Sequence, residues 1–213
     1  MTSTANSLQR AWWLKTLHQW HWISAATALI GLLLFSITGI TLNHAASIEA
    51  SPRVSTEERT LPAPLRDSLT ALATTAADTD KPPALPDAVR QWIAREFSLD
   101  TRGREIEWSA DEVYIALPRP GGDAWMRIGL PDGTTVHEVT SRGWISYLND
   151  LHKGRNTGTA WSWFIDVFAV ACLLFAITGL LILKLHAANR ALTWPLVAAG
   201  LTLPVLVAIF TIH

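Results

Sequence analysis

Two apolar stretches with nearly the same sequence decide how this chain is built. The first, LLFSITGITLNHA, covers residues 33–45, and the second, LLFAITGLLILKLHA, covers residues 173–187. Both pass through LLF-x-ITG, and both carry a histidine at or near their end. Each belongs to a longer apolar run of membrane-helix length, since roughly 20 residues at about 1.5 Å rise cross a hydrocarbon core of about 30 Å. The pair therefore predicts two membrane spans that share a local sequence.

The chain contains three such runs. Residues 22–42 carry no charge, residues 163–185 carry only Asp166 and Lys184 near their ends, and residues 192–212 form the third run. Hydrophobic residues make up 49% of the chain and the mean hydropathy is +0.22, which is too apolar for an ordinary soluble domain of this length. We therefore expect three transmembrane helices.

A polar region separates the first two runs. Seventeen of the eighteen carboxylates lie between Glu49 and Asp150. The net charge of −1 gives no reason to expect a nucleic-acid partner. The expected fold is an α-helical membrane protein with three transmembrane helices and a small α+β module between spans one and two. Because the module is small for an independent core, we expect it to pack on the membrane helices or on a second copy.

The pattern within the polar region changes along the chain. Residues 48–84 are rich in Pro, Ala, Thr and charge and are typical of a linker, with a short helix over 65–76. Residues 86–97 place apolar side chains on one helical face, namely Val89, Trp92, Ile93 and Phe97. Four short strands are expected, separated by Pro- and Gly-containing turns, over residues 105–109, 112–117, 124–130 and 134–139.

Short basic flanks predict the orientation in the membrane. Arg10 and Lys15 precede the first span, and Lys184 and Arg190 lie between the second and the third. Because cytoplasmic loops carry the excess of Lys and Arg, the N-terminus is expected in the cytoplasm. The module then lies outside the membrane, in the periplasm if the cell is Gram-negative.

Six of the seven histidines lie at the ends of the predicted spans. An inner group comprises His18, His21 and His186, and an outer group comprises His44, His152 and His213. The seventh, His137, lies in a predicted strand of the module. Paired imidazoles on neighbouring helices are the ligand set of a bis-His haem b, held without covalent attachment because the chain has no Cys-x-x-Cys-His motif. Two alternatives stay open: histidines that merely tolerate the interface, and a zinc or copper site.

Two Thr-Gly pairs and one carboxylate within the spans also have alternative interpretations. Thr38-Gly39 and Thr178-Gly179 allow either close helix packing or room for a flat ligand. Asp166 is the one carboxylate outside the polar region. It is a candidate outer-shell partner of His152, or else an interfacial acid near the start of span two.

Several motifs resemble the PepSY-associated transmembrane helix family. They are His21-Trp22, ITLNHA (40–45), DLHKGRNTG (150–158), WSWFIDVFA (161–169) and the tail from Leu185-His186 to Ile212-His213. The resemblance covers nearly the whole chain, and the DLHKGRNTG-x-x-WSWFID block is its most specific part. Residues 85–139 resemble a degenerate PepSY module. The wider group includes inner-membrane reductases of ferric siderophores that carry haem b between histidines.

The resemblance implies a function and a set of ligands. His21 with His186 would hold an inner haem supplied by a cytoplasmic or quinol electron donor. His44 with His152 would hold an outer haem that reduces a ferric chelate or siderophore in the periplasm of a bacterium. His18 and His213 are further candidates. The better-described reductases have an additional span, so a homodimer is one way to complete the site.

Two other functions remain open on the sequence. One is a non-enzymatic PepSY-type module that binds or regulates a periplasmic partner, and the other is a metal-ion uptake accessory. The segments expected are a cytoplasmic N-terminus with the first span (1–46), the linker (47–84), the PepSY-like module (85–141), an interfacial segment with the second span (142–190), and the third span (191–213). Membrane lipid surrounds the spans in every case.

Overall fold

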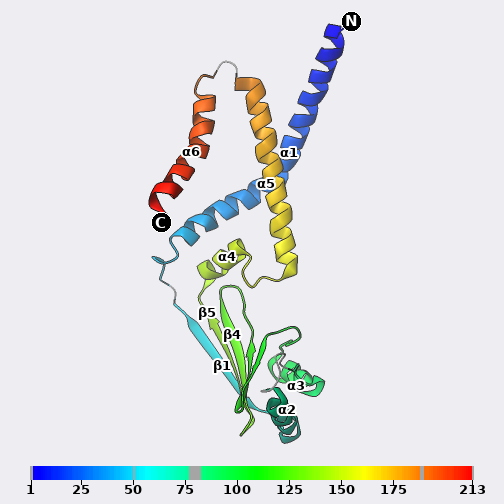
Figure 1. Cartoon of the computed structure of the whole chain (residues 1–213), viewed down its shortest axis with the longest axis vertical. Coiled ribbons are helices and arrows are strands. Elements are labelled where there is room, and N and C mark those ends of the chain that lie inside the picture. Colours follow the sequence, from blue (N-terminus) through cyan, green and yellow to red (C-terminus); the bar gives the residue numbers. More distant parts are fainter. Residues whose placement is uncertain (1, 50, 77–82, 188–189, 213) are drawn as a thin grey trace. The chain divides into compact units, whose positions relative to one another are not determined.

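The computed structural model describes residues 2–49, 51–76, 83–187 and 190–212. They belong to two compact units, of which one comprises Met1–Leu34 and Trp163–His213 and the other Phe35–Ser162. The elements in chain order are α1 (Thr2–Asn43), β1 (Arg53–Thr60), α2 (Ala63–Ala76), α3 (Asp87–Phe97), β2 (Ile106–Trp108), β3 (Glu112–Ala116), β4 (Gly122–Gly129), β5 (Thr134–Ser141), α4 (Trp144–Lys153), α5 (Thr159–His186) and α6 (Thr193–Thr211) (Figure 1).

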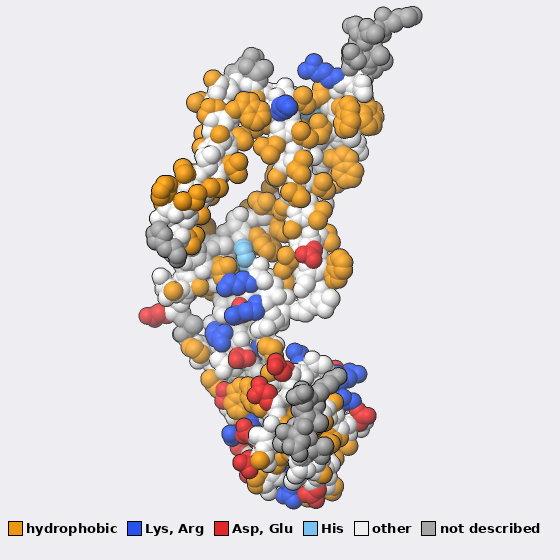
Figure 2. Space-filling model, in the orientation of Figure 1, with side chains coloured by type: hydrophobic (Ala, Val, Ile, Leu, Met, Phe, Trp, Pro, Cys, Tyr) orange, Lys and Arg blue, Asp and Glu red, His pale blue; other side chains and the backbone are white. Residues whose placement is uncertain are grey.

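Three helices are long and apolar enough to cross a membrane. They are Gln9–Asn43 within α1, Thr159–His186 and Thr193–Thr211. Hydrophobic side chains cover their visible surfaces, whereas charged side chains gather over the sheet and its helices (Figure 2). An exposed apolar surface of this extent requires lipid around it. The chain is therefore a multi-pass membrane protein, as the sequence predicts.

Small residues bring α1 and α5 together. Ser24 and Ala28 are buried on one face of α1, with 3% and 1% of their surface exposed. One turn further on, a Cβ atom on Gly31 would lie 2.4 Å from Cε2 of Phe168, so any larger residue there would require the Phe168 ring to move. In a membrane, helices associate mainly by such close packing. Gly31 is thus a glycine at which the two helices pack closely.

The module contains one antiparallel sheet in the order β1-β5-β4-β3-β2. The four predicted strands are all present as β2 to β5, within two residues of the expected bounds. Strands β3 and β4 alternate buried and accessible side chains, which leaves one face of the sheet for a helical layer. Figure 1 shows α2 and α3 on that face.

The core lies between this face and the two helices. Val89 and Ile93 of α3 are fully buried, as are Ile115 of β3 and Met126 of β4. All four residues of the predicted helical face, namely Val89, Trp92, Ile93 and Phe97, are buried. Burial of a large aliphatic side chain contributes about 1.5–3 kcal/mol, so this layer supplies most of the module's stability.

The linker expected over residues 48–84 needs a correction, because it contains a strand. Residues 53–60, RVSTEERT, form β1 and pair with β5 over eight registered positions, from Arg53 opposite Ser141 to Thr60 opposite Thr134. Every residue of β1 is exposed, so no apolar alternation marks it in the sequence. Its charged side chains are typical of an edge strand that avoids pairing with other chains. The short helix expected at 65–76 is present within α2.

The buried histidine of the module predicts a pH dependence. Burial lowers the pKa of His137, although Glu57 acts in the opposite direction, and Arg119 lowers the pKa further. Below pH of about 6.5 the unfolded chain takes up a proton that the folded module still excludes, so stability falls as pH falls through this range. We expect His137→Gln to reduce the loss of melting temperature between pH 7 and pH 5, measured by tryptophan fluorescence on the detergent-solubilised chain. An equal loss in both proteins would contradict this reading.

Candidate functional site

The first ITG motif, residues 37–39, holds a histidine that lies far away in the sequence. His152, on α4, places its Nδ1 2.7 Å from Oγ1 of Thr38 on α1. Its ring lies against Phe35, with centroids 4.9 Å apart. A Cβ atom on Gly39 would lie 3.7 Å from Cε1 of His152, so the glycine borders the imidazole directly. Phe35, Thr38 and Gly39 therefore form three sides of one histidine pocket.

The second ITG motif, residues 177–179, repeats this arrangement with different partners. His21, on α1, places its Nδ1 3.1 Å from Oγ1 of Thr178 on α5. Its ring stacks on Phe175 at a centroid distance of 4.8 Å. A Cβ atom on Gly179 would lie only 3.3 Å from Cε1 of His21. The shared sequence F-x-x-T-G thus encodes a shared pocket, and each copy receives a histidine from another helix.

The threonines determine which ring nitrogen carries the proton. Thr178 directs its single hydroxyl hydrogen to backbone carbonyls of its own helix, 2.7 Å away at Leu174 and 3.1 Å at Phe175. Thr38 does the same toward Phe35, at 3.1 Å. Each hydroxyl oxygen can then accept a hydrogen bond, so this arrangement favours an imidazole that donates through Nδ1–H. The lone pair of Nε2 is consequently available to a metal ion.

Three further histidines have the same tautomer for a simpler reason. Nδ1 of His18, His44 and His186 lies 2.8, 3.0 and 2.9 Å from the carbonyl oxygen four residues earlier in its helix. Since a carbonyl only accepts, each Nδ1 carries the hydrogen. None of the three Nε2 atoms makes a hydrogen bond within the described residues. His18, His21, His44, His152 and His186 therefore each offer the nitrogen that a haem iron would bind.

The structure brings some of the predicted ligands together and not others. The rings of His18 and His186 meet edge-on, with centroids 5.9 Å apart. His18, rather than His21, is thus the histidine beside His186. His44 is exposed, and within the described residues no ring contact joins it to His152. The prediction for His213 concerns a position outside the described residues.

Asp166 takes no visible part in these contacts. Its side chain is exposed on α5, and in the parts of the chain that the structure describes it makes no hydrogen bond or ion pair. Its suggested role beside His152 remains a prediction. Clusters of three or more potential metal ligands are also absent from the described residues.

A buried carboxylate fixes the helix that carries His152. Asp150 on α4 is only 3% exposed and accepts a hydrogen bond of 2.8 Å from the backbone N–H of Gly121, in the turn before β4. Its other oxygen lies 2.7 Å from Nη2 of Arg155. A Cβ atom on Gly121 would lie 2.7 Å from Cα of Tyr147, so α4 lies directly on this turn. The module thereby holds α4 in place.

The rest of the DLHKGRNTG block shapes the chain after α4. Gly154, Asn156 and Gly158 all have positive φ, at 66°, 59° and 80°, which suits glycine and asparagine. Trp161 donates from Nε1 to the carbonyl of Leu151 and holds the loop against α4. Sequence reasoning missed both Asp150 and the two threonines as partners. The available signal was the repetition of a polar Thr-Gly pair inside two apolar runs.

The carboxylate contact makes a testable prediction about α4. Asp150→Ala removes the partner of the Gly121 N–H, and an unsatisfied buried donor costs about 1–3 kcal/mol. We expect faster hydrogen–deuterium exchange in α4 and at residues 120–122, measured by mass spectrometry on the full chain in detergent. The matched control is Asp111→Ala, at an exposed aspartate whose side chain makes no hydrogen bond in the described residues. Unchanged exchange in Asp150→Ala would show that the turn does not hold α4.

Comparison with known proteins agrees with this architecture. No curated protein and no solved structure matches the chain. The model of one family, described as PepSY_TM-like, matches residues 12–213, which includes all three membrane helices, the sheet and both F-x-x-T-G pockets. This chain is therefore a member of the PepSY_TM-like family of membrane proteins.

Proposed function

We propose that the chain is a membrane electron-transfer protein that holds haem b between histidines and reduces ferric chelates or siderophores for iron assimilation. The observation that carries the proposal is the repeated F-x-x-T-G pocket. In each copy a threonine fixes the imidazole through Nδ1 and leaves Nε2 available. A histidine that only stabilised the interface would not need the same hydrogen bond, aromatic contact and bordering glycine twice.

The residues present suit a haem in several respects. Nε2 of His21 and of His152 would serve as iron ligands, with His18, His44 and His186 as the candidates for opposite ligands. A metal-bound imidazole usually donates its other N–H to an outer-shell acceptor, and Thr38 and Thr178 are such acceptors. Exposed apolar side chains of the membrane helices suit the body of a tetrapyrrole. Bound between two imidazoles, haem b would supply one-electron transfer.

The sidedness of the reaction rests on the charges that flank the spans. The positive charges of Arg10, Lys15, Lys184 and Arg190 favour a cytoplasmic side for the inner histidines in a bacterial inner membrane. His21 would then receive electrons from a cytoplasmic or quinol donor, whereas His152 would face the periplasm and the ferric substrate. A homodimer remains part of the proposal as a source of opposite ligands.

Haem content after single substitutions tests the proposal. The protein would be expressed with haem supplied, purified in detergent and assayed by the pyridine haemochrome method. We expect a low-spin spectrum in the wild type. His21→Ala and His152→Ala should each lose the haem of their own site, because alanine leaves the iron without one ligand. The double variant of His44 and His152 should be little worse than either single variant, since residues that act as a unit are non-additive.

Two kinds of control make the result specific. His137→Ala removes a histidine of the module and should leave the spectrum unchanged. Thr38→Val and Thr178→Val keep the ligand but remove its acceptor, so they should weaken haem binding about 10- to 100-fold, whereas Thr→Ser variants should not. A colourless wild-type protein would exclude the reductase and favour the non-enzymatic module, whose sheet carries the stacked, half-buried pair Tyr114 and Trp125.

A further inference from the structure

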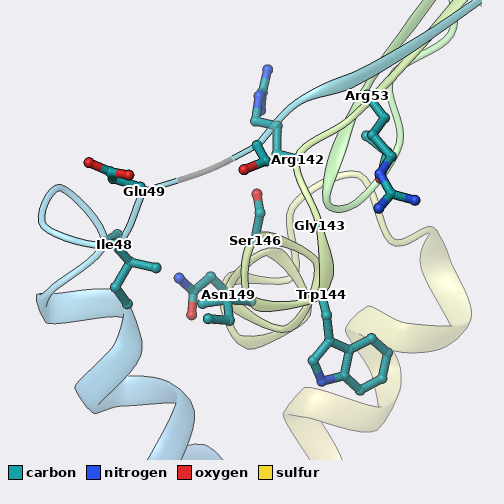
Figure 3. A pocket seen from close by; sticks show the side chains of 12 residues that line it. Ile48, Glu49, Arg53, Arg142, Gly143, Trp144, Ser146 and Asn149 are labelled. Atoms are coloured by element: carbon teal, nitrogen blue, oxygen red, sulfur yellow. The ribbon is translucent and has the colours of Figure 1, made fainter.

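A cavity of about 770 Å³ lies within the unit that holds His152. Its walls come from the segment after α1, the facing ends of β1 and β5, and the first turns of α4. Figure 3 shows side chains from all three walls, among them Glu49, Arg53, Arg142, Ser146 and Asn149. A volume of this size suits a small ligand, since such sites typically measure about 300–1,000 Å³.

The charges around the cavity favour an anion. Arg53 and Arg142 both line it, and neither makes an ion pair within the described residues. Glu49 is the single carboxylate among the lining residues. Arg155, by contrast, already pairs with Asp150. Two arginines without a carboxylate partner at one cavity present several donors, and the planar donor fork of each guanidinium group suits carboxylate or other oxygen anions.

Hydroxyl groups and a helix end add to this preference. Ser51, Ser141 and Ser146 line the cavity beside the arginines. The first turn of α4 also lines it, with no side-chain cap and no acidic residue in that turn. Its backbone N–H groups and the partial positive charge of the helix end add to the attraction of the two guanidinium groups for an anion.

The cavity is adjacent to the outer histidine pocket. Asn149 lines the cavity and accepts a hydrogen bond of 2.8 Å from Thr41, whereas His152, three residues further along α4, lies against Thr38 on the same stretch of α1. Three residues correspond to about 4.5 Å along a helix. A ligand in the cavity would thus lie about one helical turn from the histidine proposed to hold the outer haem.

We propose that this cavity is the binding site for an anionic ferric chelate, with Arg53 and Arg142 as the residues that select its charge. The inference rests on the proposed function, because it identifies the substrate class of that reaction and its place beside His152. A phospholipid phosphate has the same oxygen-anion chemistry, so the test separates a chelate from a lipid headgroup.

Binding of gallium(III) citrate tests the site without electron transfer, because gallium(III) resembles iron(III) but is not reduced. The full chain would be placed in nanodiscs of neutral phosphatidylcholine and titrated calorimetrically at low ionic strength. We expect Arg53→Gln/Arg142→Gln to weaken binding by about tenfold or more, since hydrogen bonds to charged groups are lost. The control Arg95→Gln/Arg119→Gln makes the same change of charge at exposed arginines outside the cavity and should bind as the wild type does.

Other probes decide between the sources of the anion. The gallium complex of desferrioxamine B is cationic and should bind more weakly, with no dependence on the two arginines. Nanodiscs with added phosphatidylglycerol should leave the binding of gallium citrate nearly unchanged. Strong competition by this lipid, together with no binding of gallium citrate in neutral nanodiscs, would reassign the cavity to a headgroup and overturn the proposal.

The result of the gallium citrate titration does not depend on whether the protein holds haem. Haem content is expected to be the same in the wild type and in Arg53→Gln/Arg142→Gln, because neither arginine contacts a histidine pocket. Equal affinity of both proteins for gallium citrate would overturn the chelate site even if haem is bound. A colourless protein that still binds gallium citrate through the arginines would leave the site in place and remove the reductase.

Discussion

The hydrogen bond between a threonine hydroxyl and an imidazole is the interaction on which both histidine pockets depend. An imidazole N–H without an acceptor in an apolar helix pair would cost about 1–3 kcal/mol, so the ring must find one. Thr38 and Thr178 provide it because their own hydrogens are directed to backbone carbonyls. The glycine that follows each threonine leaves space for the ring. One short motif therefore fixes position, orientation and tautomer together.

The module holds His152 in its pocket through α4. His152 can lie against Thr38 only if α4 stays where the sheet places it, and Asp150 makes that connection through the backbone of Gly121. The same helix contributes Ser146 and Asn149 to the cavity. The module thus contributes in two ways: it positions His152, the proposed haem ligand, and it forms walls of the proposed substrate site.

Much of the fold could be predicted from the sequence, since its apolar patterns are strong. The three spans, the buried face of α3 and strands β2 to β5 all follow from runs or periodicities of apolar side chains. Strand β1 was not predicted, because backbone pairing with β5 holds it in the sheet while all its side chains stay exposed. Such an edge strand has no pattern of its own.

The site was predictable in its residue types but not in its pairings. The histidines at the helix ends and the repeated Thr-Gly pairs can be read from the sequence, whereas the partners His21 with Thr178 and His152 with Thr38 depend on how the helices cross. Periodicity on one helix could not choose between His18 and His21. In the structure both histidines contact α5: His18 lies beside His186, and His21 lies beside Thr178.

The tautomer of the ring nitrogens tests the central claim most directly. Nitrogen-15 NMR of histidine-labelled protein without haem distinguishes a protonated from an unprotonated ring nitrogen. The account predicts that Nδ1 of His21 and His152 carries the hydrogen while Nε2 is unprotonated, and that Thr178→Val and Thr38→Val abolish this preference at the respective ring. Protonated Nε2 in the wild-type protein at both positions would contradict it, because neither histidine would then be prepared to bind iron.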